Sequence, residues 1–374
     1  MKEKLSALRS KYIIDGIQQE LTPAQMLESV GGAHGPSVTL EEEGVPGRIV
    51  DESSWPGPSA VDTDPSKVEK YLAKVMAARR RPSLVFAAEQ TRAAMESVLL
   101  DCIWRVGQFR LGDLCLDARW TWNDRTIGNM AGLYSSVSAA AEFSDALGTG
   151  IRSWSEAQGE CGVEFTAALR AGIDDDSLVD RPFGSEKPRL GPASISSVLN
   201  PDPGSWVVYI PFDTSSYRLG GSLLAQVLKA SPAVAPAVND ADYFIDCYEV
   251  VRELVEDGIV LAGATVRDGG LITALKGMTT ARTGVDADLS DLRHATGEED
   301  MVRLLFAEVP GVLVQIRDID FDYLDAELLL QDIAFYPLGH PTEGGDLKLH
   351  SSAKNGIQNI LESLIRSQSG EGED

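Results

Sequence analysis

The chain has 374 residues, of which 43% are hydrophobic and 24% charged, the composition of a folded protein long enough for two domains. Its 57 acidic and 33 basic residues give a formal net charge of −24, so phosphate backbones and anionic lipid surfaces should repel it. We therefore expect neither nucleic acid nor a membrane as a partner. No uncharged apolar stretch is long enough to cross a bilayer, and Met1–Lys4 leads into no signal-peptide core, so we expect a cytoplasmic protein.

The cysteines and histidines predict neither disulfides nor a zinc site, because no Cys-x-x-Cys pair and no cysteine–histidine ligand spacing occurs. We expect four reduced thiols, at Cys102, Cys115, Cys161 and Cys247. The four histidines fall in or near predicted loops, at His34, His294, His340 and His350. Since no nucleophile–histidine arrangement follows from these spacings, the sequence leaves the catalytic residues unknown.

The first 59 residues are predicted to form an extension of helices and loops. Leu5–Ile17 is expected to be helical, and Thr22–Pro23 opens a second short helix with an N-cap followed by proline at N1. From Gly31 to Pro65 the chain is rich in Gly, Pro, Ser and Glu, which is typical of loops.

Residues 60–172 alternate between helical and strand patterns. The expected elements are a helix opened by Asp64–Pro65 and stopped by Pro82, a short strand at Leu84–Ala87, a helix at Ala93–Arg105, a strand at Leu114–Asp117 and a helix at Ser135–Leu147. This alternation predicts a layered α/β domain.

A linker at 173–190 and a tail at 346–374 delimit a second domain at 191–345. Asp174–Asp176 and the Pro/Gly-rich segment Pro182–Pro192 mark the linker. Three consecutive carboxylates could hold a metal, but in a linker they are more often a solvated charge run. Residues 346–374 are predicted to form a helix and an acidic tail that ends in Glu371–Asp374.

A strand–turn–helix unit lies at the centre of the second domain. Trp206–Phe212 is an apolar, β-branched run that predicts a buried strand, and Leu223–Leu228 predicts a helix. The turn between them carries Arg218, Gly220, Gly221 and Ser222. Paired glycines, free amides at a helix start and a fixed positive charge favour an anion site, although plain turn-and-cap chemistry is the commoner explanation.

A second unit of the same kind follows. Val260–Val266 predicts a strand, Arg267–Gly270 a glycine turn and Leu271–Leu275 the start of a helix, with an amphipathic helix at Tyr243–Asp257 between the two units.

The order of these motifs resembles the second half of phosphoribosylformylglycinamidine synthase. That family carries an R-L-G-G-S turn, here Arg218–Ser222, and a later S-D-G-G-L turn, here Arg267–Leu271. Its closing strand–helix–strand corresponds to Gly311–Ile316 and Phe335–Gly339. The resemblance implies an α/β (α+β) fold of two domains, with an ATPase-like module of the aminoimidazole ribonucleotide synthetase superfamily at 60–172 and its partner α/β domain at 191–345.

The resemblance also implies an ATP-dependent amidation in purine biosynthesis, with ATP or ADP and Mg²⁺ as cofactors. The family positions that survive are Asp117 and Asp268 as metal ligands and Arg218, Gly220, Gly221, Ser222, Gly269 and Gly270 as nucleotide-binding residues. Others are lost: Val98 and Cys102 stand where Glu and Asn are expected, Glu96 is out of register, and Arg152–Glu156 replaces a G-K-D-S turn.

Three functions remain open at this point. The chain could be a subunit or fragment of the ligase, a non-catalytic structural paralogue without its nucleotide site, or another small-molecule kinase or synthetase of the superfamily. The first implies a homodimer, or a complex with a first-half synthase chain and a glutaminase subunit. Any ligand is expected between the two domains, with Arg218 facing its phosphate or carboxylate and Asp268 facing a metal.

Overall fold

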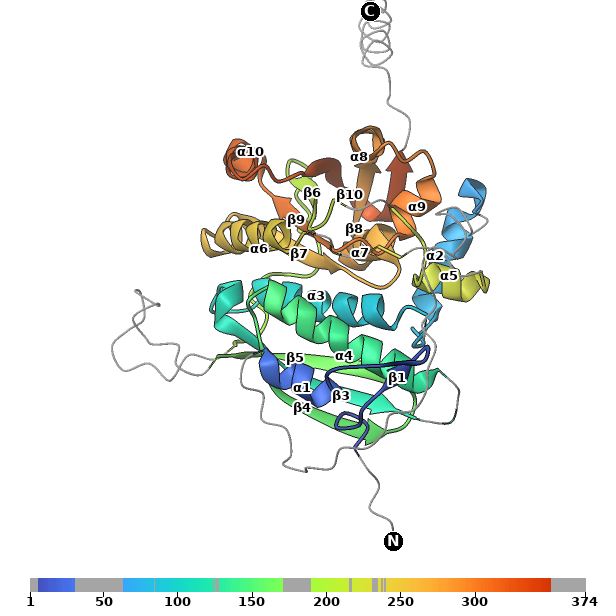
Figure 1. Ribbon diagram of the computed structural model, residues 1–374. Coiled ribbons are helices and arrows are strands. Elements are labelled where there is room, and N and C mark those ends of the chain that lie inside the picture. Colours follow the sequence, from blue (N-terminus) through green and yellow to red (C-terminus); the bar gives the residue numbers. More distant parts are fainter. Residues whose placement is uncertain are drawn as a thin grey trace, which may run out of the picture.

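The structure, a computed structural model, describes residues 6–30, 63–170 and 190–350, apart from residues 84, 124, 126, 127, 215, 216, 231–234, 237 and 239. In these residues two main β-sheets lie on either side of packed helices (Figure 1). The α/β (α+β) fold class is confirmed. The linker predicted at 173–190 lies outside the described residues except for Leu190, so the domain limits stay predictions.

The N-terminal segment differs from its prediction. Instead of a helix over Leu5–Ile17, the strands β1 (Ile13–Ile14) and β2 (Ile17–Gln18) form an antiparallel hairpin. Asp15 and Gly16 turn the chain with φ of 52° and 83°, and such an Asp-Gly pair is a strong hairpin signal that the helical interpretation overlooked.

The second short helix forms as predicted. Helix α1 (Pro23–Ser29) begins after Thr22, whose hydroxyl accepts a hydrogen bond from the amide of Gln25 at 3.3 Å. The Gln25 side chain accepts one from the amide of Thr22 at 2.8 Å, so a complete capping box fixes this helix start.

The smaller sheet has the order β4-β3-β5, with β3 parallel to β4 and antiparallel to β5. The strands are β3 (Leu114–Trp122), β4 (Ile151–Gln158) and β5 (Gly162–Leu169). Alternate residues of β3 are apolar and buried, among them Leu116, Ala118 and Trp120. They pack in one core with apolar side chains of α3 (Ala87–Ile103) and α4 (Asn129–Ala146).

Two predictions in this region meet different outcomes. The helices expected at Ala93–Arg105 and Ser135–Leu147 correspond to α3 and α4, which both begin earlier. The strand expected at Leu84–Ala87 is wrong, because residues 85 and 86 form a turn and α3 begins at Ala87; residue 84 lies outside the described part. The helix expected between Asp64–Pro65 and Pro82 is shorter in the structure. A 3-10 turn at Pro65–Lys67 leads into α2 (Val68–Ala77), which ends before Pro82.

The larger sheet has the order β7-β9-β6-β10-β8, antiparallel except for the β10–β8 pair. Its strands are β6 (Trp206–Pro211), β7 (Val260–Val266), β8 (Thr283–Asp288), β9 (Gly311–Ile316) and β10 (Tyr336–His350). Both faces of β6 are buried, with Val208 and Ile210 in one core cluster and Val207 and Tyr209 in the other.

Helices cover both faces of this sheet. The core that contains α3 and α4 also contains apolar residues of α6 (Ala241–Glu256) and α10 (Phe321–Leu330). The other face packs against α2, α5 (Leu223–Leu228), α7 (Gly270–Met278), α8 (Ser290–Thr296) and α9 (Met301–Phe306). One apolar core therefore runs from the smaller sheet through α3 to the larger sheet. None of the helices in the described ranges is long and apolar enough to cross a membrane.

Candidate functional site

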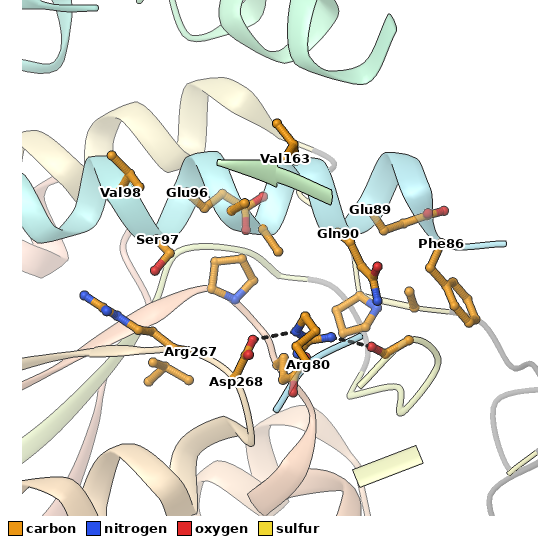
Figure 2. A pocket seen from close by; sticks show the side chains of 18 of the residues that line it. Arg80, Phe86, Glu89, Gln90, Glu96, Ser97, Val98, Val163, Arg267 and Asp268 are labelled. Carbon is orange, nitrogen blue, oxygen red and sulfur yellow. Dashed lines mark hydrogen bonds and ion pairs between the residues drawn. The ribbon is translucent and has the colours of Figure 1, made fainter. Parts of the chain in front are cut away.

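A cavity of about 490 Å³ lies where α3, β5 and the two glycine turns meet. Figure 2 shows α3 crossing one side, with Glu89, Gln90 and Glu96 along it, while Arg80 and Asp268 meet opposite. The first predicted turn contributes Gly220 and Gly221 to the lining. The volume is in the range of small-molecule sites in proteins.

The first glycine turn is held by ordinary capping and packing. The Ser222 hydroxyl accepts from the amide of Ala225 at 3.1 Å and donates to the carbonyl of Leu219 at 2.7 Å. Gly221 has φ of 64°, and a Cβ there would lie 3.0 Å from the Phe86 ring. The positive φ of Gly221 and the N-cap role of Ser222 therefore account for these two residues without a ligand.

The second turn has the same kind of constraint. Gly269 and Gly270 both have positive φ, 87° and 74°. A Cβ on Gly270 would lie 2.7 Å from the carbonyl oxygens of Leu305 and Ala307, so the helix start packs directly on α9 and the residue after it. This close approach explains the glycine pair without a ligand.

Glu308 joins the two turns. Its Oε1 accepts hydrogen bonds from the amide of Leu223 at 2.9 Å and from the amide of Gly269 at 2.7 Å. Burial raises the pKa of Glu308, and the guanidinium of Arg80 opposes this rise. Amides that could have met an external anion at the two turns thus meet a carboxylate of the protein itself.

Arg80, which is distant in sequence, contacts both glycine turns and Glu308. We call the contacts of Glu308 and Arg80 with the two turns the joint. The Nε of Arg80 bonds to Oδ1 of Asp268 at 2.7 Å and its Nη1 donates to the carbonyl of Gly221 at 2.7 Å, while Nη2 pairs with Glu308. The Gln226 side chain holds the neighbouring backbone at residues 79 and 81. The sequence placed Arg80 near the end of the helix stopped by Pro82, so its contacts with the glycine turns were missed.

The two predicted metal ligands are not brought together. Asp117 lies on β3, where Arg152 and Ser153 bond to its carboxylate and the hydrogen bond from Arg152 lowers its pKa. Asp268 lies in the second glycine turn and is paired with Arg80. No group of three or more His, Cys, Asp or Glu side chains that could hold a metal occurs in the described ranges.

The predicted nucleotide-binding residues divide into two sets. Gly220 and Gly221 line the cavity, as does Asp268. The others lie in the same two turns but outside the lining of this cavity: Arg218, Ser222, Gly269 and Gly270. The cavity therefore includes three of the predicted binding and metal residues, and much of its polar lining comes from α3 and from Arg80.

Glu96 is the functional candidate that sequence reasoning set aside. It lies on the buried face of α3 beside Met95 and Leu99, is 4% exposed and lines the cavity. Burial raises its pKa to about 8, and the charge of the buried Asp213 adds to the rise. At pH 7 its carboxyl group is mostly protonated and can donate as well as accept a hydrogen bond. The sequence signal that could have identified Glu96 is its position among the apolar residues of a helix, where a buried acid is unusual.

The C-terminal ends of α3 and β7 are in contact beside Arg267, which lines the cavity. Arg267, which stands where the family has serine, pairs with Asp101. The Thr265 hydroxyl donates to Asp101 at 3.0 Å and accepts from the Trp104 indole at 3.0 Å. A Cβ on Gly263 would lie 2.4 Å from the Trp104 ring, so helix and strand are in close contact.

The charge of the lining is unfavourable for an anion. The cavity is lined by five acidic residues, Glu89, Glu96, Glu164, Asp268 and Glu308, and by two arginines, Arg80 and Arg267. Both arginines already have carboxylate partners. A nucleotide phosphate would have to bring its own cations or displace these pairs.

Comparison with known proteins shows similarity in sequence to a curated protein. No protein-family model matches the chain. Over 247 residues it is 24% identical to human phosphoribosylformylglycinamidine synthase. The chain is a divergent relative of that synthase. The matched region covers 66% of the chain but only 18% of the human synthase, so it corresponds to less than a fifth of the length of this relative.

Solved structures of similar proteins give low scores. Phosphoribosylformylglycinamidine synthase II from Thermotoga maritima has a TM-score of 0.48 at 15% identity, over 72% of this chain and 40% of that one. The T. maritima PurL structure complexed with ADP has a TM-score of 0.45 at 13% identity, over 77% and 40%. Thiamine-monophosphate kinase from Stenotrophomonas maltophilia scores 0.43 at 11% identity, over 73% and 80%. The relation to the synthase therefore depends on the sequence match.

Proposed function

We propose that this chain is an architectural half of a phosphoribosylformylglycinamidine synthase-like ligase in purine biosynthesis. It would pair with a first-half chain, and with a glutaminase subunit as ammonia source, without itself transferring a phosphoryl group. The observation that carries the proposal is the joint of Glu308 and Arg80, which occupies the amides and the aspartate expected to meet nucleotide and metal.

Magnesium chemistry would need several oxygen ligands around one point. Asp117 and Asp268 lie in different parts of the fold, each bound to an arginine, Arg152 and Arg80 respectively. A triphosphate entering at the glycine turns would have to remove Glu308 from two backbone amides and separate it from Arg80. These rearrangements oppose phosphoryl transfer at this site.

Titration calorimetry with Mg-ADP at millimolar concentration tests the proposal. We expect no saturable heat from the unmodified chain. The ligase assay with ammonia should show no turnover by the chain alone, and turnover with a first-half chain should be unaffected by Asp268→Asn. If Mg-ADP binds and Asp268→Asn abolishes both binding and turnover, the architectural role is refuted.

A second candidate is a working nucleotide site, which would make the chain a catalytic subunit. The cavity of about 490 Å³ favours it, because Gly220, Gly221 and Asp268 all belong to its lining. In this case Mg-ADP should bind, and Asp268→Asn should weaken the binding by more than about 1.5 kcal/mol, the scale of a charge-assisted contact. A matched control is Glu160→Gln, on the exposed turn between β4 and β5.

Pairing with another chain is part of either proposal. In the described residues, β4 and β5 are the edges of the three-stranded sheet, and a free strand edge can pair with another strand. Light scattering during gel filtration should show a homodimer, or a heterodimer when a first-half chain is added. A monomer under both conditions would contradict the expected assembly.

A further inference from the structure

The outer face of α10 carries an apolar stripe that faces solvent. Ile319 is 83% exposed, Tyr323 44% and Leu330 76%, and Leu329 beside them is 64% exposed. These four are among the nine large hydrophobic side chains with high exposure in the described ranges. Such a concentration on one short segment is typical of an interaction surface.

The spacing shows that this stripe is separate from the face that packs into the core. Tyr323, Ala326 and Leu330 follow one another at intervals of three and four residues, so they share one side of α10. Ile319 lies in the 3-10 turn Asp318–Asp320 just before the helix. The buried residues Leu324 and Leu328 lie on the other side. The helix therefore has two apolar faces, of which the core uses one. Figure 1 places α10 at the outer edge of the upper part of the fold.

The stripe has an acidic rim. Between residues 318 and 332 there are six acidic residues and no lysine or arginine: Asp318, Asp320, Asp322, Asp325, Glu327 and Asp332. Asp257, at the end of α6, extends the rim, because it accepts a hydrogen bond from the Tyr323 hydroxyl at 2.9 Å. Arg317, just before this segment, is paired with Asp320.

We propose that the outer face of α10 binds a basic amphipathic helix of a partner protein, with apolar side chains on the stripe and Lys or Arg side chains on the rim. The rim decides between occupants. A second copy of this chain would place the same acidic residues against each other, and an anionic lipid surface would be repelled in the same way. This proposal is independent of the nucleotide cavity and of the proposed function.

The test uses the full chain and two fluorescein-labelled synthetic peptides. Both peptides are 18 residues long with leucine at helical spacing; the polar positions are lysine in one and glutamate in the other. Fluorescence anisotropy should show saturable binding of the lysine peptide and none of the glutamate peptide. Leu330→Lys should weaken the lysine-peptide binding at least tenfold. The matched control is Met76→Lys, which changes a 55% exposed apolar residue of α2 and should leave binding unchanged.

Several results would overturn the proposal. They are binding of neither peptide, equal binding of both, or equal effects of Leu330→Lys and Met76→Lys. A concentration-dependent dimer that Leu330→Lys abolishes would show that a second copy covers the stripe. Binding that appears only when the chain is shortened to end at His350 would show that its own C-terminal residues cover it. Because Leu330 is exposed, circular dichroism should show the same fold and melting temperature for the variant.

Discussion

Glu96→Gln should remove a large part of the pH dependence of stability. Glu96 is buried in the wall of the cavity, where burial and the charge of Asp213 raise its pKa from 4.5 to about 8. Each pKa unit corresponds to about 1.36 kcal/mol, so the difference amounts to about 5 kcal/mol at most. Glutamine keeps the shape and hydrogen-bonding groups of the protonated carboxyl but cannot ionise.

The sign follows from proton linkage. Between pH 4.5 and 8 the folded chain keeps a proton on Glu96 that the unfolded chain releases. The stabilising contribution is therefore fully present below pH 4.5 and is lost as the pH rises through about 8. At pH 9 the unmodified chain should be less stable than the Glu96→Gln variant, and at pH 4.5 the two should be similar.

Urea unfolding at pH 5, 7 and 9 measures this difference. The free energy of unfolding of the unmodified chain should fall, relative to Glu96→Gln, by several kcal/mol across the series. The control Glu160→Gln, at an exposed surface position, should follow the unmodified chain at every pH. If the unmodified chain and Glu96→Gln run parallel from pH 5 to 9, Glu96 does not hold its proton and the account of the cavity wall is wrong.

Glu308→Gln should lower the free energy of unfolding by about 2 kcal/mol, since it weakens charge-assisted bonds to two amides and to Arg80; a double-mutant cycle with Arg80→Met that shows no coupling would contradict this. Gly263→Ala should cost about 1–3 kcal/mol, because its Cβ would lie 2.4 Å from the Trp104 ring; an unchanged melting temperature would argue against the tight contact. Ser222→Ala should cost about 1 kcal/mol through loss of the N-cap, measured in urea, and no loss would count against that cap.

Three strands of the larger sheet, β6, β7 and β9, were predictable because they are short, apolar and bounded by turns. Strand β8 and the polar part of β10, which runs on to His350 where a helix and tail were predicted from residue 346, were not. The predicted strand Val260–Val266 coincides with β7, and Trp206–Phe212 contains β6 with one extra residue. Strands buried on both faces give continuous apolar runs, which stand out in a sequence. At Leu5–Ile17 the apolar residues were read with a helical period, although the Asp15–Gly16 pair between them gives a hairpin.

The edge strand β4 of the smaller sheet gave no such signal. In β4 only Ile151 and Trp154 are buried. The other residues of the strand, up to Gln158, are mostly polar and exposed. Residues Arg152–Glu156 were therefore compared with a catalytic turn of the resembled family and not read as a strand. Exposed edge strands lack the apolar alternation on which strand prediction depends.

The site was predictable only in its local parts. Both glycine turns and the Ser222 cap follow from neighbouring residues, and the structure contains them. The joint does not, because Arg80 is 188 residues from Asp268 and 228 from Glu308 in sequence. Such pairings depend on how the elements pack, and no local pattern encodes them. Glu96 was missed for a related reason, since its raised pKa depends on burial and on Asp213, which is distant in sequence.

The acidic net charge influences the cavity and the α10 face in different ways, and salt should distinguish them. In the cavity wall Glu96 is only 4% exposed, so dissolved ions screen its charge little. The rim around Ile319 and Leu330 includes acids exposed to solvent, such as Asp322. The screening length falls from about 8 Å at physiological salt to about 3 Å at 1 M. High salt should therefore weaken lysine-peptide binding at α10 and leave the stability difference between Glu96→Gln and the unmodified chain at pH 9 almost unchanged. If both quantities fell together, the Glu96 carboxyl group would have to be as exposed to solvent as the acids of the rim.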